Sequence, residues 1–309
     1  MVATEDQQQH SHGQAPPPSQ GCNPVVFKNM VIFGDSFSDS GNVFRLTNGA
    51  WPVPERYPDG QFSNGHVWAG WVAKETALNM SNFALGGATT DSTVVQGYTG
   101  PKVDIPVRGF IQQIEELYLP NRPPLDDATK DSTLFVVCFE GNDFLFDANV
   151  STETVLANIE RGIHRLVEVG AKHILVVGDY DIGRLPFCRK DRALAEQTSA
   201  LTRKQRDEYQ DLVRGLSHQY GQPAGKGCRP FHGCGVGVNI VYFDLLEFIN
   251  ELHEPQHLER MGIVDNTHSF LSGDGMAECS DPEGYFFYDD YHLNTKVHRQ
   301  VANGILAFL

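Results

Sequence analysis

Short apolar runs alternate along the chain with stretches in which apolar residues recur at helical spacing. We expect strands, each rich in β-branched or aromatic side chains, at Val25–Phe33, Leu134–Phe139, His173–Val177 and Val238–Phe243. We expect helices at His66–Leu78, at Thr152–Val169, within Lys190–Tyr220 and at Thr295–Phe308. This alternation is typical of a mostly parallel sheet that is covered by helices. The pattern therefore predicts an α/β protein with a three-layer α/β/α sandwich.

The length, the net charge and the apolar runs of the chain exclude some classes of function. The chain has 309 residues, of which 40% are hydrophobic, and its formal net charge is −15. That length supports one large domain with a sizeable core. An acidic surface repels phosphate backbones and anionic bilayers, and no apolar run approaches the roughly 20 residues that span a membrane. We therefore expect no nucleic-acid partner and no stable membrane insertion. We also expect a monomer.

The first residues differ in composition from the rest of the chain. Residues 1–24 are rich in Gln, His and Pro, and we expect a disordered tail there, followed by one domain over residues 25–309. The tail contains no apolar stretch that could serve as a signal-peptide core. Two glycosylation sequons, at Asn79 and Asn149, favour a secreted protein whose leader is absent from this chain. A cytoplasmic protein is the alternative.

The cysteines show no metal-binding spacing. There are six of them, and no two are separated by only two residues, which argues against a zinc ribbon. Cys138 lies within the apolar run LFVVCF, where we expect a buried thiol. Cys228 and Cys234 flank a glycine-bearing loop and can pair with each other or with another cysteine.

Polar motifs containing glycine follow two of the predicted strands. The first strand runs into Gly34-Asp35-Ser36, and the second runs into Glu140–Asp143. In an open parallel sheet, ligands bind in the crevice at the carboxyl ends of the strands. We therefore expect the two motifs to converge on one site.

Ser36 is the candidate nucleophile of this site. A serine attacks only when a base takes its proton, and the base needs a carboxylate to orient it. The segment Asp289–His292 offers both groups, because an acid three residues before a histidine can close a short loop around the imidazole. Each motif alone is common, but together they predict a triad of Ser36, His292 and Asp289. Asp290 is a rival for the acid role.

Acyl transfer also needs donors for the negative charge that develops on the carbonyl oxygen. The segment NFALGGATT offers the backbone amide of Gly87. Because glycine has no side chain, a substrate can approach this amide closely. Asn142 offers a side-chain amide at a strand end. A tight turn and a turn cap are the structural alternatives for these two residues.

One further motif suggests a different function, that of a zinc protease. His253-Glu254-Pro255-Gln256-His257 matches the His-Glu-x-x-His spacing of zinc proteases, which requires both histidines on one helical face. Pro255 would break such a helix and fits better in the first turn of a new one. We therefore expect no metal and no organic cofactor.

Four blocks in order, GDSFSDSGN, NFALGGATT, EGND and DDYH, resemble the signature blocks of the GDSL esterase/lipase family within the SGNH hydrolases. The stretch RYPDGQFSNGHVWAGWVA resembles the fungal and plant-like branch, which includes carbohydrate acetylesterases. The resemblance covers roughly Val25 to Leu309 and implies a flavodoxin-like α/β/α fold. It implies Ser36 as nucleophile, with Asp289 and His292 completing the triad. It also implies an oxyanion hole of the Ser36 amide, the Gly87 amide and the Asn142 side chain.

The sequence departs from the family pattern at two positions. The third block usually reads Gly-x-Asn-Asp, and here Glu140 takes the first position, where a carboxylate would oppose the charge of an oxyanion. A proline that often follows the catalytic histidine is replaced by Leu293.

These observations predict a serine esterase that hydrolyses short-chain esters, in particular acetyl esters of carbohydrates. Its partner is then a small-molecule or carbohydrate ester. A lipase or phospholipase with the same triad is the first alternative. A relative that binds carbohydrate or protein after its catalysis has decayed is the second, and Glu140 is the feature that keeps it open.

Overall fold

The computed structural model describes residues 24–122, 125–221, 230–231, 237–271 and 281–309. The expected disordered tail falls outside the described residues except for Pro24, and so do Cys22, Cys228, Cys234 and Cys279. The division of the chain into a tail and one domain, and the pairing of Cys228 and Cys234, therefore stay predictions.

Five parallel strands form the central sheet, in the order β2-β1-β5-β6-β7. The strands are β1 (Asn29–Gly34), β2 (Asn79–Asn82), β5 (Thr133–Cys138), β6 (His173–Val177) and β7 (Asn239–Phe243). Numbered among themselves along the chain, they follow the order 2-1-3-4-5 of the flavodoxin-like fold. The predicted parallel α/β architecture is confirmed.

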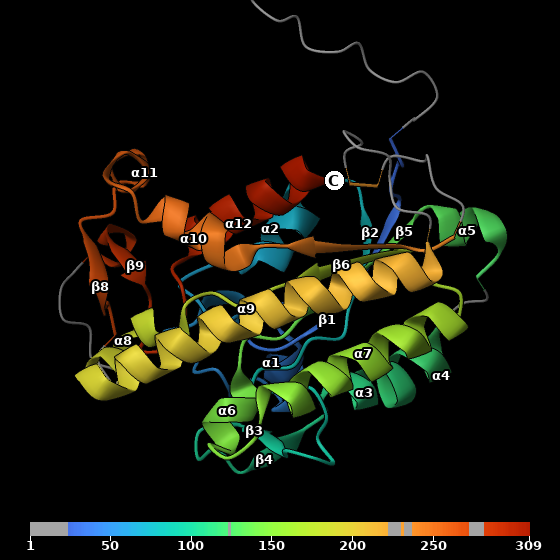
Figure 1. The fold of residues 1–309 in the computed structure, drawn as a ribbon. Helices are drawn as coiled ribbons and strands as arrows, with labels where there is room; N and C mark the ends of the chain where they lie inside the picture. The colour runs from blue at the N-terminus through green and yellow to red at the C-terminus, as the bar shows by residue number, and fades with distance from the viewer. Residues whose placement is uncertain (1–23, 123–124, 222–229, 232–236, 272–280) are drawn as a thin grey trace, which may run out of the picture.

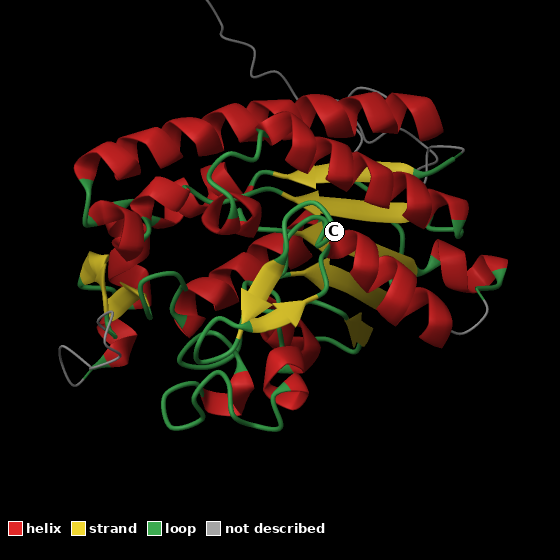
Figure 2. Cartoon of the chain, turned by 90° about the horizontal axis from the view of Figure 1, so that it is seen from below, coloured by secondary structure: helices red, strands yellow, loops and turns green. Residues whose placement is uncertain are grey.

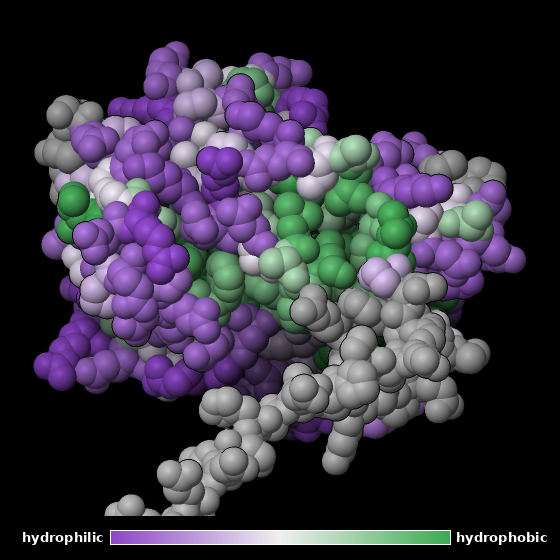
Figure 3. Space-filling model, turned by 90° about the horizontal axis from the view of Figure 1, so that it is seen from above, coloured by the Kyte–Doolittle hydropathy of each residue, from purple (hydrophilic) through white to green (hydrophobic). Residues whose placement is uncertain are grey.

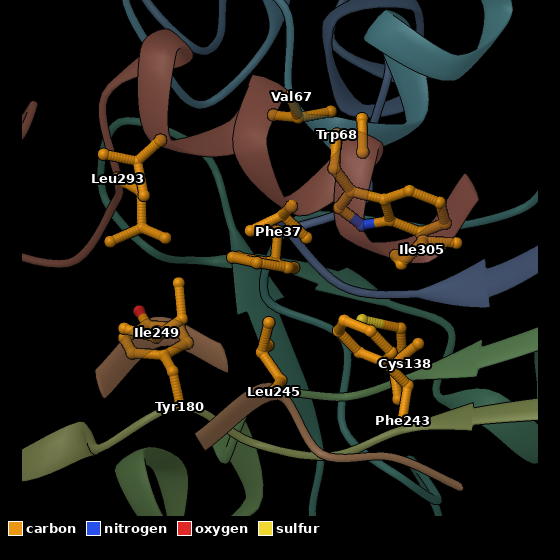
Figure 4. Packing of buried hydrophobic residues seen from close by; sticks show 14 of the residues in the cluster. Phe37, Val67, Trp68, Cys138, Tyr180, Phe243, Leu245, Ile249, Leu293 and Ile305 are labelled. Carbon is orange, nitrogen blue, oxygen red and sulfur yellow. The ribbon is translucent and has the colours of Figure 1, made fainter. Parts of the chain in front are cut away.

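Helices cover both faces of this sheet, so the molecule has three layers (Figures 1 and 2). Met30 and Ile32 of β1 pack into one core, and Val31 and Phe33 into the other, because alternate side chains of a strand point to opposite faces. The first core lies under α2 (Trp68–Glu75), α10 (Leu245–Leu252) and α12 (Thr295–Phe308). The second lies under α3 (Phe110–Gln112), α7 (Thr152–Glu168) and α9 (Arg192–Tyr220). Figure 4 shows the tight packing of the first core.

The predicted helices are close to those of the structure, and α12 has both of its expected ends. Two strands differ. β1 begins at Asn29 rather than Val25, because the Val25 and Lys28 amides bond to the carbonyls of Phe231 and Ser132, outside the sheet. The sequence analysis missed β2, whose residues NMSN are polar and lie at the edge of the sheet.

Shorter elements surround the sheet. They are α1 (Asn42–Leu46), α4 (Leu119–Asn121), α5 (Asp127–Asp131), α6 (Asn142–Phe146), α8 (Pro186–Arg189), α11 (Pro255–Met261), the 3₁₀ turns at Pro58–Gly60, Ile182–Arg184 and Pro282–Gly284, and a π-helical turn at Gln113–Tyr118. An antiparallel hairpin joins β3 (Gly97–Thr99) to β4 (Ile105–Val107). A small parallel pair joins β8 (Asp265–Ser269) to β9 (Tyr285–Phe287).

The segment with zinc-protease spacing is split between two helices. α10 ends at Leu252, and α11 begins at Pro255, which occupies the first turn as predicted. His253 instead stacks on Phe286, with 4.0 Å between ring centroids, and burial lowers its pKa to about 4. Within the described ranges, no group of three or more His, Cys, Asp or Glu side chains is arranged to hold a metal ion.

The surface of the molecule is mostly polar on the face that Figure 3 shows. Seen from above, it is largely hydrophilic, with one apolar area near the middle of the view (Figure 3). None of the helices in the described part of the chain combines the length and the apolar character needed to cross a membrane.

Candidate active site

The site lies where the order of the sheet reverses, at the ends of β1 and β5. Gly34 and Cys138 are register partners at these ends, so the segments that follow them leave the sheet side by side. A Cβ on Gly34 would come within 2.6 Å of the Cys138 carbonyl oxygen, which explains the need for glycine here. Asp35 joins the two segments by accepting the Glu140 amide hydrogen at 2.7 Å. The expected convergence of the two motifs is therefore observed.

The three residues expected to form a triad lie in one hydrogen-bonded line. His292 Nε2 is 2.9 Å from Ser36 Oγ, and His292 Nδ1 is 2.8 Å from Asp289 Oδ2. Because an ionised carboxylate only accepts hydrogen bonds, Nδ1 carries the hydrogen and Nε2 is left to accept from the serine hydroxyl. This arrangement can activate a serine for attack on a carbonyl carbon.

The loop around Asp289 keeps its carboxyl ionised. Asp289 Oδ1 accepts the backbone N–H groups of Tyr291 and His292, at 2.8 and 2.9 Å. Burial alone would raise the pKa of this carboxyl, but the charge of His292 and these hydrogen bonds hold it below the ordinary value. Asp290, the rival acid, instead accepts from Ser269 Oγ at 3.0 Å and pairs with Lys190.

Two backbone amides face the cavity beside Ser36. The Gly86-Gly87 turn is closed by the bond from the Ala88 amide to the Leu85 carbonyl, and Gly87 has a φ of 85°. A Cβ on Gly87 would come within 2.0 Å of the Tyr98 carbonyl oxygen, so only glycine fits. The Ser36 and Gly87 amides donate to no acceptor among the described residues, and both residues line the cavity. They are therefore available to an oxyanion.

Asn142, the third expected donor, also lines the cavity but is already engaged. Its amide nitrogen donates to the Ala88 carbonyl at 3.0 Å and to Asp35 Oδ2 at 3.2 Å. These bonds fix the side chain at the junction of three motifs. It would contribute to an oxyanion hole by exchanging one of them.

Buried carboxylates connect the motifs that surround the site, a role that the sequence analysis missed. Asp39 accepts the amides of Gly86, Gly41 and Val43, at 3.0, 2.9 and 3.1 Å. Burial raises its pKa to about 6 despite these donors. Asp143 accepts the Thr90 amide at 2.9 Å and the Thr90 hydroxyl at 2.6 Å. The only sequence signal for these roles was their position inside the motifs.

Glu140, the departure from the family pattern, lies at the edge of the same cavity. One carboxyl oxygen accepts the Tyr180 amide at 3.1 Å, and the other accepts the Cys138 thiol at 3.3 Å. Burial, followed by the charges of Asp179 and Asp35, raises the pKa of Glu140 well above its ordinary value. This shift favours the neutral form of Glu140, which brings no charge that opposes an oxyanion. Cys138 is buried with a free thiol, as predicted.

The cavity above Ser36 has a volume of about 560 Å³ and is largely apolar. One wall comes from β3, the turn that follows it and α6, and includes Tyr98, Val103 and Leu145. The opposite wall comes from α8 and the first turns of α9, with Phe187 and Leu194. Of the three tryptophans, Trp51 lines this cavity, whereas Trp68 is buried in the first core.

Comparison with known proteins identifies the family of this chain. The model of the GDSL-like lipase/acylhydrolase family matches residues 30–305. The chain belongs to this family. Membership identifies it as a carboxylic ester hydrolase, while the branch within the family stays a prediction.

Three known proteins, two compared by sequence and one by structure, are similar to this chain. The thermolabile hemolysin of Vibrio parahaemolyticus is 28% identical over 300 residues, which cover 92% of this chain and 64% of the hemolysin. A GDSL esterase/lipase of Arabidopsis thaliana is 24% identical, over 91% of this chain and 85% of the relative. A solved structure of a G-D-S-L family protein from Veillonella parvula aligns with a TM-score of 0.48 at 11% identity, over 90% of this chain and 96% of that one.

Proposed function

We propose that this chain hydrolyses carboxylic esters through an acyl-enzyme on Ser36, with His292 as base and Asp289 as its orienting acid. The observation that carries the proposal is the continuous line from Ser36 Oγ to His292 Nε2, 2.9 Å, and from His292 Nδ1 to Asp289 Oδ2, 2.8 Å. Secretion and a monomeric state, expected from the sequence, stay predictions.

The proposed reaction has two halves. In the first, Ser36 Oγ attacks the ester carbonyl carbon while His292 Nε2 takes the hydroxyl proton, and the amides of Ser36 and Gly87 bind the developing oxyanion. His292 returns the proton to the leaving alcohol as the carbon–oxygen bond breaks. In the second half, water attacks the acyl-enzyme while His292 takes its proton, and His292 then returns that proton to Ser36 Oγ as the bond between Oγ and the acyl carbon breaks and the acid is released. Groups of the chain and water suffice, so the proposal needs no cofactor.

The cavity lining favours a longer acyl chain than the acetyl group expected from the sequence. Tyr98, Val103, Leu145 and Tyr291 line the cavity and are among the exposed large apolar residues of the described chain. Burying alkyl groups against such a lining stabilises a bound chain by about 0.8 kcal/mol per methylene. An acetyl group would leave most of this surface unused, and a sugar would find few hydrogen-bond partners there. We therefore place lipase-type esters before acetylated carbohydrates.

Initial rates on p-nitrophenyl acetate and p-nitrophenyl decanoate test both parts of the proposal. We expect a higher kcat/KM for decanoate, and a loss of turnover on both esters in Ser36→Ala. Ser92→Ala, which changes a serine outside the cavity lining, is the matched control. Equal rates in the wild type and Ser36→Ala would contradict the triad. A clear preference for acetate would restore the short-chain interpretation.

A further inference from the structure

Tyr57 reaches the catalytic carboxylate from a distant part of the chain. Its hydroxyl donates to Asp289 Oδ2 at 2.7 Å, across 232 positions of sequence. Burial and the charge of Asp289 raise the pKa of Tyr57, so the phenol keeps its proton and acts as a donor. No step of the proposed reaction uses this group.

The other donors to this carboxylate are local. The amides of Tyr291 and His292 and the His292 ring all come from the three residues that follow Asp289. Among the described residues, Tyr57 is the one donor that ties the carboxylate to another part of the fold. Without the Tyr57 hydroxyl, only hydrogen bonds from its own loop would hold the Asp289 carboxylate.

The segment that carries Tyr57 is itself held against the catalytic loop. The Tyr57 amide bonds to the Val53 carbonyl at 2.9 Å, and the Tyr288 hydroxyl donates to the Arg56 carbonyl. The rings of Tyr57 and Tyr288 meet edge to face, with 5.4 Å between centroids. Five residues after Tyr57, the Phe62 ring packs on the His292 imidazole at 5.2 Å. One segment therefore contacts both the acid and the base.

We propose that Tyr57 is a positioning residue, which holds the Asp289 carboxylate charged and turned toward His292 Nδ1. The proposal rests on the Ser36–His292–Asp289 triad proposed above. The Tyr57 hydroxyl gives Asp289 Oδ2 a second hydrogen-bond partner besides His292. If the carboxylate rotated away from the imidazole, it would lose this charge-assisted hydrogen bond as well. The oriented imidazole then keeps Nε2 aimed at Ser36.

Tyr57→Phe removes the hydroxyl and keeps the ring, and Tyr288→Phe is the matched control. Both changes delete a phenol in the same edge-to-face pair, but the control hydroxyl bonds to a backbone carbonyl rather than to Asp289. In Tyr57→Phe we expect kcat to fall about fivefold or more with KM unchanged, since a hydrogen bond to a charged group is lost. We also expect the acid limb of the pH profile to move to higher pH, because a carboxylate with fewer donors makes the Asp289–His292 pair bind a proton more readily.

The kinetics are measured from pH 5 to 9 on the ester that the wild type prefers, beside thermal unfolding of both variants. A lowered Tm in Tyr288→Phe with an unmoved acid limb is the expected control result. The proposal is overturned if Tyr57→Phe keeps the wild-type kcat and pH profile, or if both variants lose kcat equally with no shift of the limb. Ser36→Ala separates this failure from that of the triad, because a Ser36→Ala variant that still turns over ester contradicts the triad itself.

Discussion

The two halves of the candidate site are held in place in different ways. On the acid–base side, Asp289 and His292 lie on one loop, whose own amides bond to the carboxylate. On the oxyanion side, Gly86 is held by Asp39, 47 positions away, and Asn142 by Asp35, 107 positions away. The first half is assembled mainly by local contacts, and the second by buried carboxylates that join distant segments.

This difference predicts different responses to mutation. Damage to the acid–base half removes the chemistry with a smaller effect on the fold, because most donors to Asp289 come from its own loop. Damage to the oxyanion half loosens the connections between the segments, so activity and stability fall together. Each prediction below tests one side of this contrast.

The largest effect is expected for Asp289→Asn. An amide in place of the carboxylate can donate to Nδ1, which favours the tautomer that cannot accept the Ser36 proton at Nε2. We expect kcat to fall by about 10³- to 10⁴-fold. Thermal unfolding is measured on the same preparation, and a large drop in Tm would contradict the local character of this half.

Gly87→Ala comes next. The new Cβ would meet the Tyr98 carbonyl oxygen at 2.0 Å and sit at a φ of 85°, so the turn must move. We expect kcat to fall by about 10²-fold, as for the loss of one oxyanion donor, together with a lower Tm. Gly215→Ala in α9 is the control, since its Cβ would meet nothing within 4 Å and alanine favours helix. A wild-type kcat in Gly87→Ala would argue against the amide as an oxyanion donor.

Asp39→Asn tests the buried carboxylate behind that turn. The asparagine offers one acceptor oxygen where the carboxylate has two, so an amide of Gly86, Val43 or Gly41 loses its partner. We expect unfolding to become easier by about 2 kcal/mol in urea titrations, and kcat to fall severalfold. If stability falls as expected and kcat does not change, the position of the turn does not affect the chemistry. That result would contradict the link between stability and activity in the oxyanion half.

The smallest effect concerns pH and Glu140. Its pKa in the folded protein is raised, so the folded state binds the proton more tightly than the unfolded state, and stability falls as pH rises above the ordinary glutamate pKa. Glu140→Gln removes this proton, and its Tm should fall less than the wild-type Tm between pH 5 and pH 8, by about 2–4 °C. The exposed Glu55→Gln is the control. Parallel Tm curves for Glu140→Gln and the wild type would contradict a protonated Glu140.

The same contrast explains what could be predicted from the sequence. The convergence of Ser36 and His292 follows from a strand-end rule and a four-residue motif, and the ends of α12 follow from helical spacing. The strand β2 could not be predicted, because its polar residues look like a loop until β1 pairs with them. The hydrogen bond of Tyr57 to Asp289 and the bonds of Asp39 to several backbone amides depend on contacts between distant segments. Aspartates are also usually exposed, so the burial of Asp39 could not be expected. Nothing in the sequence around Glu140 indicates its raised pKa, which is caused first by burial and then by the charge of Asp179.

The close approach of Gly87 to the β3 strand has a consequence for how this enzyme can diverge. A Cβ on Gly97 would come within 2.2 Å of the Gly87 carbonyl oxygen, and Tyr98, the next residue, forms part of the cavity wall. The backbone that shapes the cavity and the backbone that carries the proposed oxyanion donor therefore touch without a side chain between them. A change that shifts the hairpin to admit a bulkier chain also shifts that amide. Selection for a new substrate at this wall acts on the rate of the chemistry at the same time.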